Sequence, residues 1–495
     1  MIINDNIFNK ENHIYRLTQD LNLNGKTITL PENCTLDFAG STISNGTIVL
    51  NNTLLLGDIR FNSNCNVEGS IKNDTLLVDW FGAKNDGVTD NTAVLRRVIE
   101  LAYNSTSNDG NTFTKLSPII KFNYGTYLVK FSLIYDEMNV KYGTFVFQGD
   151  GVVSTIIRFT GTDDSYLFYN NEVFAYTEFN NIRFVGTDKN NFMYQRASTS
   201  TESIPQSMTF NSCRFGQFKT VINSEGNAMC SEITFNTCKI VYFPNTESEL
   251  FIMNNLQAVN WRFFGTDIEQ THGTIFKIIQ GTYISLYSCS IIPFEGIVIS
   301  VPEEASANTF WLTNTPSVAM YSCRFEMRDN SQLMKIYTRA YLQFVFNTCS
   351  MGGQNINNSI GTHTIDISSP TGINQVKLIF NDCSNLLNYS YKVTATNSSY
   401  SGFVESHFNH CLFKINDIFE KSELPTISDF PAAPEGSPKF FVDGIYYGYD
   451  EFSKIRNLSP SIGYIAKSNS NEYFIANLEA EGSVRLDSTN FFKLN

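Results

Sequence analysis

The sequence is poor in charged residues and has no long apolar run. Only 17% of its 495 residues are Asp, Glu, Lys or Arg, and the formal net charge is -13. Because no Lys/Arg-rich run occurs, the electrostatic footprint of a nucleic-acid-binding protein is missing. No apolar stretch reaches the roughly 18 residues that a membrane-spanning helix needs, and residues 1–10 lack the basic start and apolar core of a secretory signal. We therefore expect no nucleic-acid partner, no membrane span and no ordinary secretory leader.

Aromatic residues are abundant instead, with 41 Phe and 24 Tyr. Aromatic and β-branched side chains suit a pleated, half-buried surface, so this composition favours strands over surface helices. A chain of this length can bury a large core, and length alone would suggest two or three compact domains. A fold built of stacked repeats can exceed that size as a single domain. From the composition we expect an all-β protein.

A short pattern of an aromatic residue, two polar residues and a cysteine returns through the middle of the chain, first as Phe-Asn-Ser-Cys at residues 210–213. Two segments fit it without cysteine: residues 259–263, where Arg262 takes the cysteine position, and residues 180–184. Repetition at about 25 to 35 residues is typical of stacked-repeat architectures. Seven of the ten cysteines occupy the pattern: Cys213, Cys238, Cys289, Cys323, Cys349, Cys383 and Cys411.

The repeat requires a change of parity between its aromatic residue and its cysteine. Strict alternation along a strand would place Phe210 and Cys213 on opposite faces. An Asn-x step, with Asn in the left-handed region that it tolerates, would end one strand on an inward aromatic ring and begin the next on an inward cysteine. One such corner per turn predicts a parallel β-helix.

In this interpretation the repeat cysteines form an internal column of small apolar side chains. A metal site would need ligands at close spacing, such as paired CxxC motifs, and the sequence has none. Disulfides between neighbouring turns are disfavoured, because a chain without a secretory signal folds in a reducing compartment.

Residues 90–102 form the best predicted helix. Thr89 or Asp90 would be its N-cap, and Val94 and Val98 lie on one apolar stripe. A stacked-repeat fold exposes apolar residues at its end, so we expect this segment to be a capping helix.

The remaining boundaries follow from composition. Residues 1–78 are short β-prone pieces cut by Gly and Pro, which indicate either small early coils or a separate β leader. The β-helix itself would run from residue 79 to residue 420. Residues 421–438 are rich in Pro and form a predicted linker, and residues 439–495 form a predicted small β domain.

Three motifs carry a resemblance to a known family. The segments WFGAKNDGVTDNT (residues 80–92), YGTYLV (124–129, with Asn123 where proline is common) and GDG (149–151) resemble, in order, the opening of the pectate-lyase-3-like β-helix family. That resemblance implies a right-handed coil. It leaves the chemistry open, since the family includes lyases, hydrolases and non-enzymatic binders.

The preceding segment LNGKTITLP (residues 23–31) resembles the leaders of tailspike proteins from phages and prophages of gut Bacteroidales. This implies a virion protein, assembled in the host cytoplasm and joined to other tail proteins through its N-terminal region. It also implies a homotrimer that binds bacterial surface or capsular polysaccharide for host attachment, with depolymerase activity open. The alternatives are a secreted or periplasmic polysaccharide lyase or glycoside hydrolase, and a purely structural tail component.

Carboxylates that could cleave a glycan gather in one segment. Glycoside hydrolysis usually needs two carboxyl groups, about 5 to 5.5 Å or 6.5 to 9.5 Å apart. Asp267 and Glu269, at i and i+2, would share a strand face with Cα atoms roughly 6.5 Å apart. Glu295 would lie near the next rung. We therefore take Asp267, Glu269 and Glu295 as candidate catalytic residues.

Trp261, His272 and Asp329 are the candidate substrate-binding residues, since an indole ring can stack on a sugar and His can exchange protons. Each of these candidates has an ordinary alternative. Outward acids in a chain of this charge are commonly solvated, a lone His beside a glycine is commonly a surface residue, and Trp packs in cores. No cofactor is predicted, although calcium-assisted β-elimination remains open.

Overall fold

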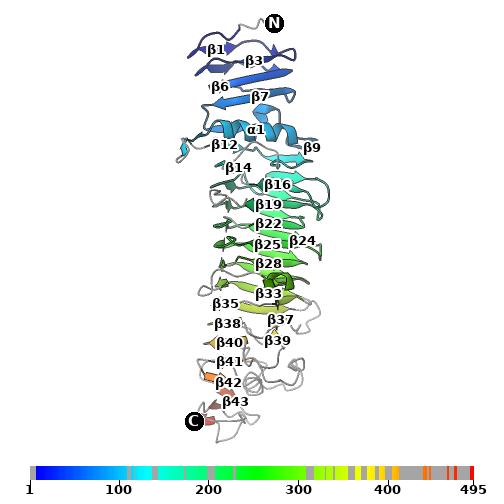
Figure 1. The fold of residues 1–495 in the computed structure, drawn as a ribbon, viewed down its shortest axis with the longest axis vertical. Coiled ribbons are helices and arrows are strands. Elements are labelled where there is room, and N and C mark those ends of the chain that lie inside the picture. The colour runs from blue at the N-terminus through cyan, green and yellow to red at the C-terminus, as the bar shows by residue number, and fades with distance from the viewer. Residues whose placement is uncertain are drawn as a thin grey trace. The chain divides into compact units, whose positions relative to one another are not determined.

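The computed structural model divides the chain into two compact units, Met1–Lys239 and Ile240–Asn495, described in turn below (Figure 1). The structure describes residues 7–108, 113–115, 117–135, 143–171, 174–197, 207–226, 230–281, 283–307, 317–328, 331–337, 341–354, 363–369, 376–384, 389–395, 404–411, 439–442, 445–447, 465–467, 473–476 and 491–494. The predicted linker of residues 421–438 lies outside these ranges.

Unit 1 begins with small coils of parallel strands. The long strand β6 pairs with β3 through its first half and with β4 through its second half, and Asn52 at φ 50° separates the two halves. The leader is therefore made of early coils, one of the two alternatives that its sequence left open. Its strands are β1 (Ile14–Leu17), β2 (Leu21–Asn22), β3 (Thr27–Thr29), β4 (Thr35–Phe38), β5 (Ile43–Ser44), β6 (Gly46–Gly57) and β7 (Cys65–Ile71).

The rest of unit 1 is a coil with three parallel ladders. The first contains β8 (Thr75–Leu77), β12 (Ile119–Lys121), β14 (Val146–Gln148), β17 (Glu178–Asn180), β20 (Thr209–Asn211) and β23 (Thr234–Asn236). The second contains β9 (Asp86–Asp90), β13 (Gly125–Val129), β15 (Thr155–Phe159), β18 (Arg183–Val185) and β21 (Arg214–Gly216). The third contains β16 (Tyr166–Asn171), β19 (Asn191–Ala197) and β22 (Thr220–Gly226). A small antiparallel pair, β10 (Ser107–Asn108) and β11 (Phe113–Lys115), lies between β9 and β12 in the chain.

Unit 2 repeats the three ladders. The first contains β26 (Trp261–Phe264), β29 (Ile284–Tyr287), β32 (Val318–Tyr321), β35 (Leu342–Asn347), β38 (Val376–Asn381), β40 (Val404–Asn409) and β41 (Lys439–Val442). The second contains β27 (Asp267–Thr271), β30 (Ser290–Pro293), β33 (Arg324–Arg328) and β36 (Ser350–Gln354). The third contains β25 (Glu249–Asn255), β28 (Thr274–Gln280), β31 (Ile297–Val301), β34 (Gln332–Tyr337), β37 (His363–Ser369) and β39 (Tyr389–Ala395). The strand β24 (Lys239–Phe243) begins at the last residue of unit 1, and a short helix η2 (Glu303–Ala307) follows β31.

These ladders confirm the predicted all-β fold with its long parallel sheets. Near the C-terminus the pairing changes, because β42 (Ile445–Tyr447) runs antiparallel to β41. The strands β43 (Ile465–Lys467), β44 (Tyr473–Ala476) and β45 (Phe491–Leu494) form a separate antiparallel sheet. A distinct C-terminal domain over residues 439–495 stays a prediction.

The corner of each turn differs by one residue from the prediction. The left-handed residue is the one directly before the cysteine. The residue before it, which is Asn in five turns and Tyr in the other two, ends the strand. The residues at positive φ are Ser212 (47°) and Thr237 (50°) in unit 1, and Ser288 (53°), Ser322 (52°), Thr348 (54°), Asp382 (51°) and His410 (51°) in unit 2. Two of them are Thr, which adopts this region at a cost of about 1 to 2 kcal/mol.

The Asn residues instead hydrogen-bond to one another from rung to rung. In unit 1 the Asn211 amide donates to Asn180 Oδ1 at 2.8 Å. In unit 2 Asn381 donates to Asn347 Oδ1 at 2.5 Å, and Asn409 donates to Asn381 Oδ1 at 2.7 Å. Each bond joins residues in register on adjacent strands, so the Asn column stabilises the corner without adopting the left-handed conformation itself.

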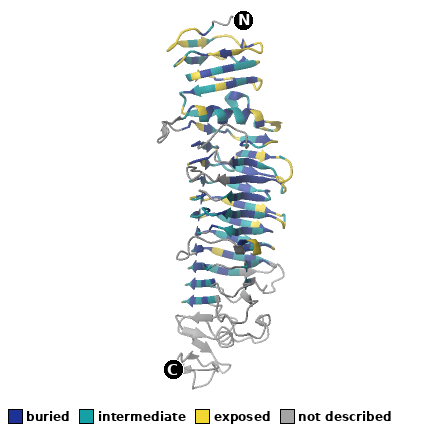
Figure 2. Cartoon of the chain, viewed as in Figure 1, coloured by how far each residue is buried: buried dark blue, intermediate teal, exposed yellow. Residues whose placement is uncertain are grey.

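The cysteine column is internal, as predicted, and every repeat thiol has an equivalent hydrogen-bond partner. Each Sγ donates to the carbonyl oxygen of an inward residue one rung earlier, for example Cys213 to Phe179 at 3.2 Å in unit 1 and Cys411 to Phe380 at 3.3 Å in unit 2. The inward rings stack beside it, with Phe346 and Phe380 centroids 4.9 Å apart at 8°. Figure 2 shows buried residues alternating with less buried ones along these strands.

One copy of the repeat was placed four residues too early. The register pairs Phe263 with Leu286 and Phe264 with Tyr287, so the cysteine position of that turn is taken by Thr266 and not by Arg262. Thr266 is fully buried, and its backbone carbonyl accepts from Ser290 at 3.2 Å. Gly265 at φ 50° supplies the corner. The earlier copy at residues 180–184 is confirmed, with Asn181 at φ 57°.

The predicted helix is α1 (Thr92–Asn104), preceded by the short helix η1 (Val78–Phe81). Its N-cap is Asn91 and not Thr89 or Asp90. Asp90 still accepts from the Thr92 amide at 3.0 Å, while the Asn91 side chain is buried and bonds to the Lys84 backbone. The helix packs against β7, η1 and β12, so it lies between the leader coils and the next ladder (Figure 1).

The motif residues that suggested the family have structural roles in unit 1. Tyr127 is fully buried, and its hydroxyl donates to Asp79 Oδ1 at 2.7 Å. The Asn123 amide donates to Asp79 Oδ2 at 2.7 Å. Burial, followed by the bond to Asp79, raises the pKa of Tyr127. Asn123, which replaces the common proline, therefore contributes a hydrogen bond that proline could not make.

The geometry of the corner predicts that substitutions at two neighbouring residues change the stability of the protein in opposite directions. Thr348→Asn should raise the free energy of unfolding by about 1 kcal/mol, because Asn tolerates the left-handed region better than Thr. Asn347→Thr should lower it by about 1 kcal/mol through loss of the bond from Asn381. Denaturant titrations of both variants and the parent provide the measurement. A loss of stability in Thr348→Asn would contradict this account of the corner.

The burial of the cysteine thiols predicts slow reaction with thiol reagents. All ten cysteines are buried, including Cys230, for which the sequence carried no expectation. Burial raises the pKa of Cys238 to about 12 and that of Cys213 still higher, so their reactive thiolate is scarce at neutral pH. We expect a disulfide-exchange reagent to label no repeat cysteine in the native protein and all seven after denaturation. Rapid native labelling of Cys289 or Cys323, read by peptide mass, would contradict an internal column.

Candidate functional site

The predicted catalytic segment lies on the outward face of the second ladder of unit 2. In β27, Ile268 and Thr271 are buried whereas Asp267 and Glu269 are half-exposed on the same face. Asp267 is in register with Ser290, and Glu269 is in register with Ile292. A bulge at Gln270, with φ 55°, then shifts the register before Thr271. Bulges of this kind re-aim side chains near functional sites.

A row of flat side chains runs along the end of this ladder. The His272 ring stacks on Phe294 with centroids 5.6 Å apart at 25°. The Arg328 guanidinium lies on Phe294 as well, 5.4 Å from the ring centroid, which is within cation–π range. We call His272, Phe294 and Arg328 the aromatic row. It presents a half-exposed ring between a proton-exchanging group and a cation.

The carboxylates around the aromatic row differ in their partners. Glu295, on the bend after β30, places Oε2 3.8 Å from His272 Nδ1. Glu326 pairs with Arg324 at 2.5 Å and also with Arg328. These two charge-assisted pairs occupy the Glu326 carboxylate, which holds Arg328 in place beside Phe294.

Glu269 is the better placed acid. It accepts a hydrogen bond from Ser290 Oγ at 3.2 Å, and it shares its strand face with Asp267. The structure therefore brings Asp267 and Glu269 to one strand face, as the sequence predicted, and it also joins Glu295 to His272, which the sequence did not predict. Their catalytic roles stay predictions.

Two of the predicted substrate contacts need comment. Trp261 is fully buried in β26 and packs edge-on against Phe251, with centroids 6.4 Å apart. It cannot stack on a sugar, so the substrate-binding assignment was wrong and the core alternative holds. Asp329 lies outside the described residues. Within the described part of the chain, no group of three or more His, Cys, Asp or Glu side chains is arranged to hold a metal ion.

The sequence analysis missed the aromatic row because its members are far apart in the chain. Phe294 lies 22 residues beyond His272 and Arg328 lies farther still, and no short motif joins them. Knowledge of the rung register would have found it. The three members of the row take equivalent positions on successive rungs. His272, Phe294 and Arg328 each directly follow a buried residue of the second ladder, namely Thr271, Pro293 and Met327.

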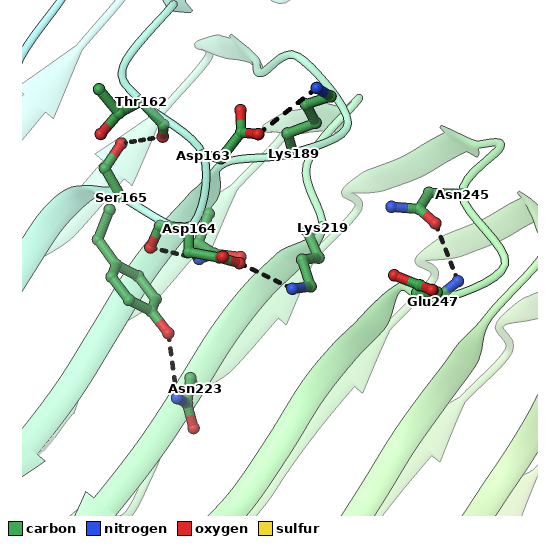
Figure 3. A network of polar contacts seen from close by, with 11 residues as sticks. Thr162, Asp163, Asp164, Ser165, Lys189, Lys219, Asn223, Asn245 and Glu247 are labelled. Atoms are coloured by element: carbon green, nitrogen blue, oxygen red, sulfur yellow. Dashed lines mark hydrogen bonds and ion pairs between the residues drawn. The ribbon is translucent and has the colours of Figure 1, made fainter.

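A second polar network lies in unit 1, where the pair Asp163 and Asp164 was interpreted as a turn feature. Asp164 is indeed left-handed, with φ 60°. Its carboxylate also pairs with Lys219 at 2.7 Å, and Asp163 pairs with Lys189 at 3.4 Å (Figure 3). The turn therefore also links three successive rungs at the surface. Among the described residues, no helix is long and apolar enough to span a membrane.

Comparison with known proteins gives one family match. Residues 77–276 match the family described as rhamnogalacturonase A/epimerase, pectate lyase-like. This supports the pectate-lyase-like resemblance over those residues, and the enzymes in its description leave a hydrolase or lyase role open, as the sequence did. No curated protein matches the chain.

Several solved structures are similar at low identity. The A-module of the mannuronan C-5 epimerase AlgE4 of Azotobacter vinelandii has a TM-score of 0.42 at 11% identity, over 67% of this chain and 91% of that chain. The α-1,3-glucanase catalytic unit of Streptomyces thermodiastaticus has a TM-score of 0.32 at 11% identity, over 74% and 67%. The enzymatically active domain of tailspike protein 2 of bacteriophage CBA120 has a TM-score of 0.31 at 10% identity, over 77% of this chain and 52% of that chain.

The burial of Trp261 predicts an effect on stability alone. Trp261→Ala should lower the free energy of unfolding by about 3 to 5 kcal/mol, because it leaves a large cavity in the core. Trp261→Phe should cost less, because its ring refills part of that cavity. Denaturant titrations of both variants and the parent test this. A Trp261→Ala protein as stable as the parent would contradict the core position of Trp261.

Proposed function

We propose that the protein is a tailspike-like component of a phage tail that binds bacterial surface polysaccharide for host attachment. The observation that carries the proposal is the aromatic row of His272, Phe294 and Arg328, flanked by Glu295. Carbohydrate recognition combines an aromatic face with a few directed hydrogen-bonding groups, and this row offers both at the surface. The pectate-lyase-like family match supports polysaccharide as the ligand class. The leader resemblance supports the phage tail.

A parallel coil suits a polymeric ligand. Successive rungs are about 4.8 Å apart, so equivalent outward side chains recur at that interval along a ladder. His272, Phe294 and Arg328 come from three successive rungs of the second ladder of unit 2. A row of this kind contacts several units of a chain-like ligand at once. Association into a homotrimer would multiply such contacts, and this too is part of the proposal.

Cleavage of the bound polymer is the second candidate function. Asp267 and Glu269 share a strand face, and their Cα atoms are roughly 6.5 Å apart, as for any residues at i and i+2 of a strand. Glycoside hydrolases use two carboxyl groups held near one another on one side of the ligand, which this pair could supply. Glu295 beside His272 is a second acid–base pair at 3.8 Å. Glu326 is excluded from this role by its two arginine partners.

The proposal predicts that one ring substitution abolishes binding. Phe294→Ala removes the half-exposed ring on which His272 and Arg328 lie, and it should weaken binding at least about tenfold. Purified capsular and lipopolysaccharide fractions from a panel of gut Bacteroidales strains are the probes, and retention in affinity gels is the readout. Phe264→Ala is the matched control, because Phe264 is an exposed ring of the same unit that lies on β26 of the first ladder.

Cleavage is tested on the fractions that bind. Glu269→Gln should lose reducing-end or unsaturated-product formation while keeping binding, whereas Glu247→Gln, an exposed acid of the same unit, should retain both. Binding without any product in the parent would leave attachment standing and remove the depolymerase candidate. Failure of the parent to bind every fraction would overturn the proposed function in favour of a purely structural tail component.

A further inference from the structure

Three tyrosine rings meet on the third ladder of unit 1, away from any residue discussed as catalytic. Tyr169 and Tyr194 are in register on β16 and β19, and their rings stack with centroids 4.6 Å apart at 16°. Tyr166, also on β16, is tilted against this stack, 5.3 Å from Tyr194 at 57° and 6.3 Å from Tyr169 at 71°. Tyr166 and Tyr169 are half-exposed, whereas Tyr194 is buried between its neighbours. The rings form an angled apolar surface that is open on the side of Tyr166 and Tyr169.

Polar groups from the next strand line this surface. On β22, Asn223 donates to the Tyr166 hydroxyl at 3.1 Å, and Glu225 accepts from the Tyr194 hydroxyl at 2.6 Å. Asn223 and Glu225 are two residues apart and half-exposed on one face. The Tyr hydroxyls, an amide and a carboxylate thus lie within one small area. That set can both donate to and accept from sugar hydroxyls.

Two side-chain amide oxygens next to the tyrosine rings accept no hydrogen bond from the described residues. Asn191 is 4% exposed and lies in register between Tyr166 and Thr220. In the part of the chain that the structure describes, Asn191 Oδ1 and Asn223 Oδ1 are buried without a hydrogen-bond partner. A buried acceptor without a donor is unfavourable. A ligand hydroxyl reaching between Tyr166 and Asn223 would supply one.

Ion pairs border the site. Asp164 pairs with Lys219 and Asp163 with Lys189, and Figure 3 shows the side chain of Lys219, the residue before β22, extending toward Asp164. Burial raises the pKa of Tyr166, and the nearby carboxylates of Glu225 and Asp164 add to that rise, so its hydroxyl remains a neutral hydrogen-bond donor. Each lysine has an aspartate partner.

The charged side chains around the three tyrosines indicate whether a neutral or an acidic glycan would bind there. Among the described side chains here, three carboxylates (Asp163, Asp164 and Glu225) stand against two ammonium groups (Lys189 and Lys219). An acidic glycan would meet a surface of its own sign, and the whole chain carries a net charge of -13. We infer that the outward face of β16, β19 and β22, built on Tyr166, Tyr169 and Asn223, is a second saccharide site that takes neutral sugar units. The inference rests on the proposed polysaccharide ligand and narrows it to a glycan with neutral segments.

The test is affinity electrophoresis of the full chain in gels that contain dextran, mannan, xyloglucan or galactan, with polygalacturonate and alginate as the acidic probes. We expect at least one neutral polymer to retard the protein and the acidic polymers to have a weaker effect. Tyr166→Ala should weaken that retardation at least about tenfold. Tyr124→Ala, which removes an exposed tyrosine of the same unit, should leave it unchanged. Raising the salt to about 0.5 M should change it less than about twofold, because a neutral ligand has no charge to screen.

A second variant keeps the test decisive if loss of the Tyr166 ring disturbs folding. Asn223→Ala removes one amide at the surface, and its melting curve should match the parent while its retardation falls. The inference is overturned if no neutral polymer retards the parent, if Tyr166→Ala and Asn223→Ala both bind as the parent does, or if polygalacturonate binds best. Should Phe294→Ala lose the bacterial polysaccharide while the Tyr166 and Asn223 variants keep it, the proposed function stands and this second site falls.

Discussion

A strand that alternates its side chains cannot keep both Phe210 and Cys213 inside, and the backbone resolves this with one left-handed residue between them. That residue is Ser212 here and Thr348 in a turn of unit 2. The left-handed conformation recurs in turn after turn, and for a non-glycine residue it costs about 1 to 2 kcal/mol each time. It is offset locally, by the Asn bonds on one side of the corner and by the thiol-to-carbonyl bonds on the other.

Because each corner has the same geometry, outward residues stack as regularly as inward ones. This is why His272, Phe294 and Arg328 lie in one row although they are far apart in sequence, and why Tyr169, Tyr194 and Asn223 do the same in unit 1. Functional surfaces in such a fold are columns of side chains, each supplied by a different turn. A single substitution in a column removes one unit of a repeated contact surface.

The sequence was sufficient for the fold and partly sufficient for the site. The spacing of the cysteines and the alternation around them predicted the parallel coil, since both record which side chains face inward. The placing of the left-handed residue on Asn, and the choice of Arg262 in the cysteine-free turn, were wrong because Asn is common at both strand ends and left-handed positions. Only the register of Phe263 with Leu286 separates these possibilities.

The site illustrates the same limit. Asp267 and Glu269 could be assigned to one face because they lie on one strand, whereas Phe294 and Arg328 required the pairing of β27, β30 and β33. Trp261 was misassigned because an indole ring suits a core and a sugar equally well, and a sequence does not state which way a strand faces. Tyr166 and Asn223 went unnoticed for want of any local motif.

The turns of unit 2 differ in length, yet their ladders stay in register. Tyr287, Tyr321 and Asn347 are paired in succession although 34 residues separate the first two and 26 the next two. The chain between β31 and β32 is longer than the chain between β34 and β35, and its described part includes η2. Insertions there leave the hydrogen bonds of the corner untouched. The scaffold can therefore diversify its surface one loop at a time, without any change to its core.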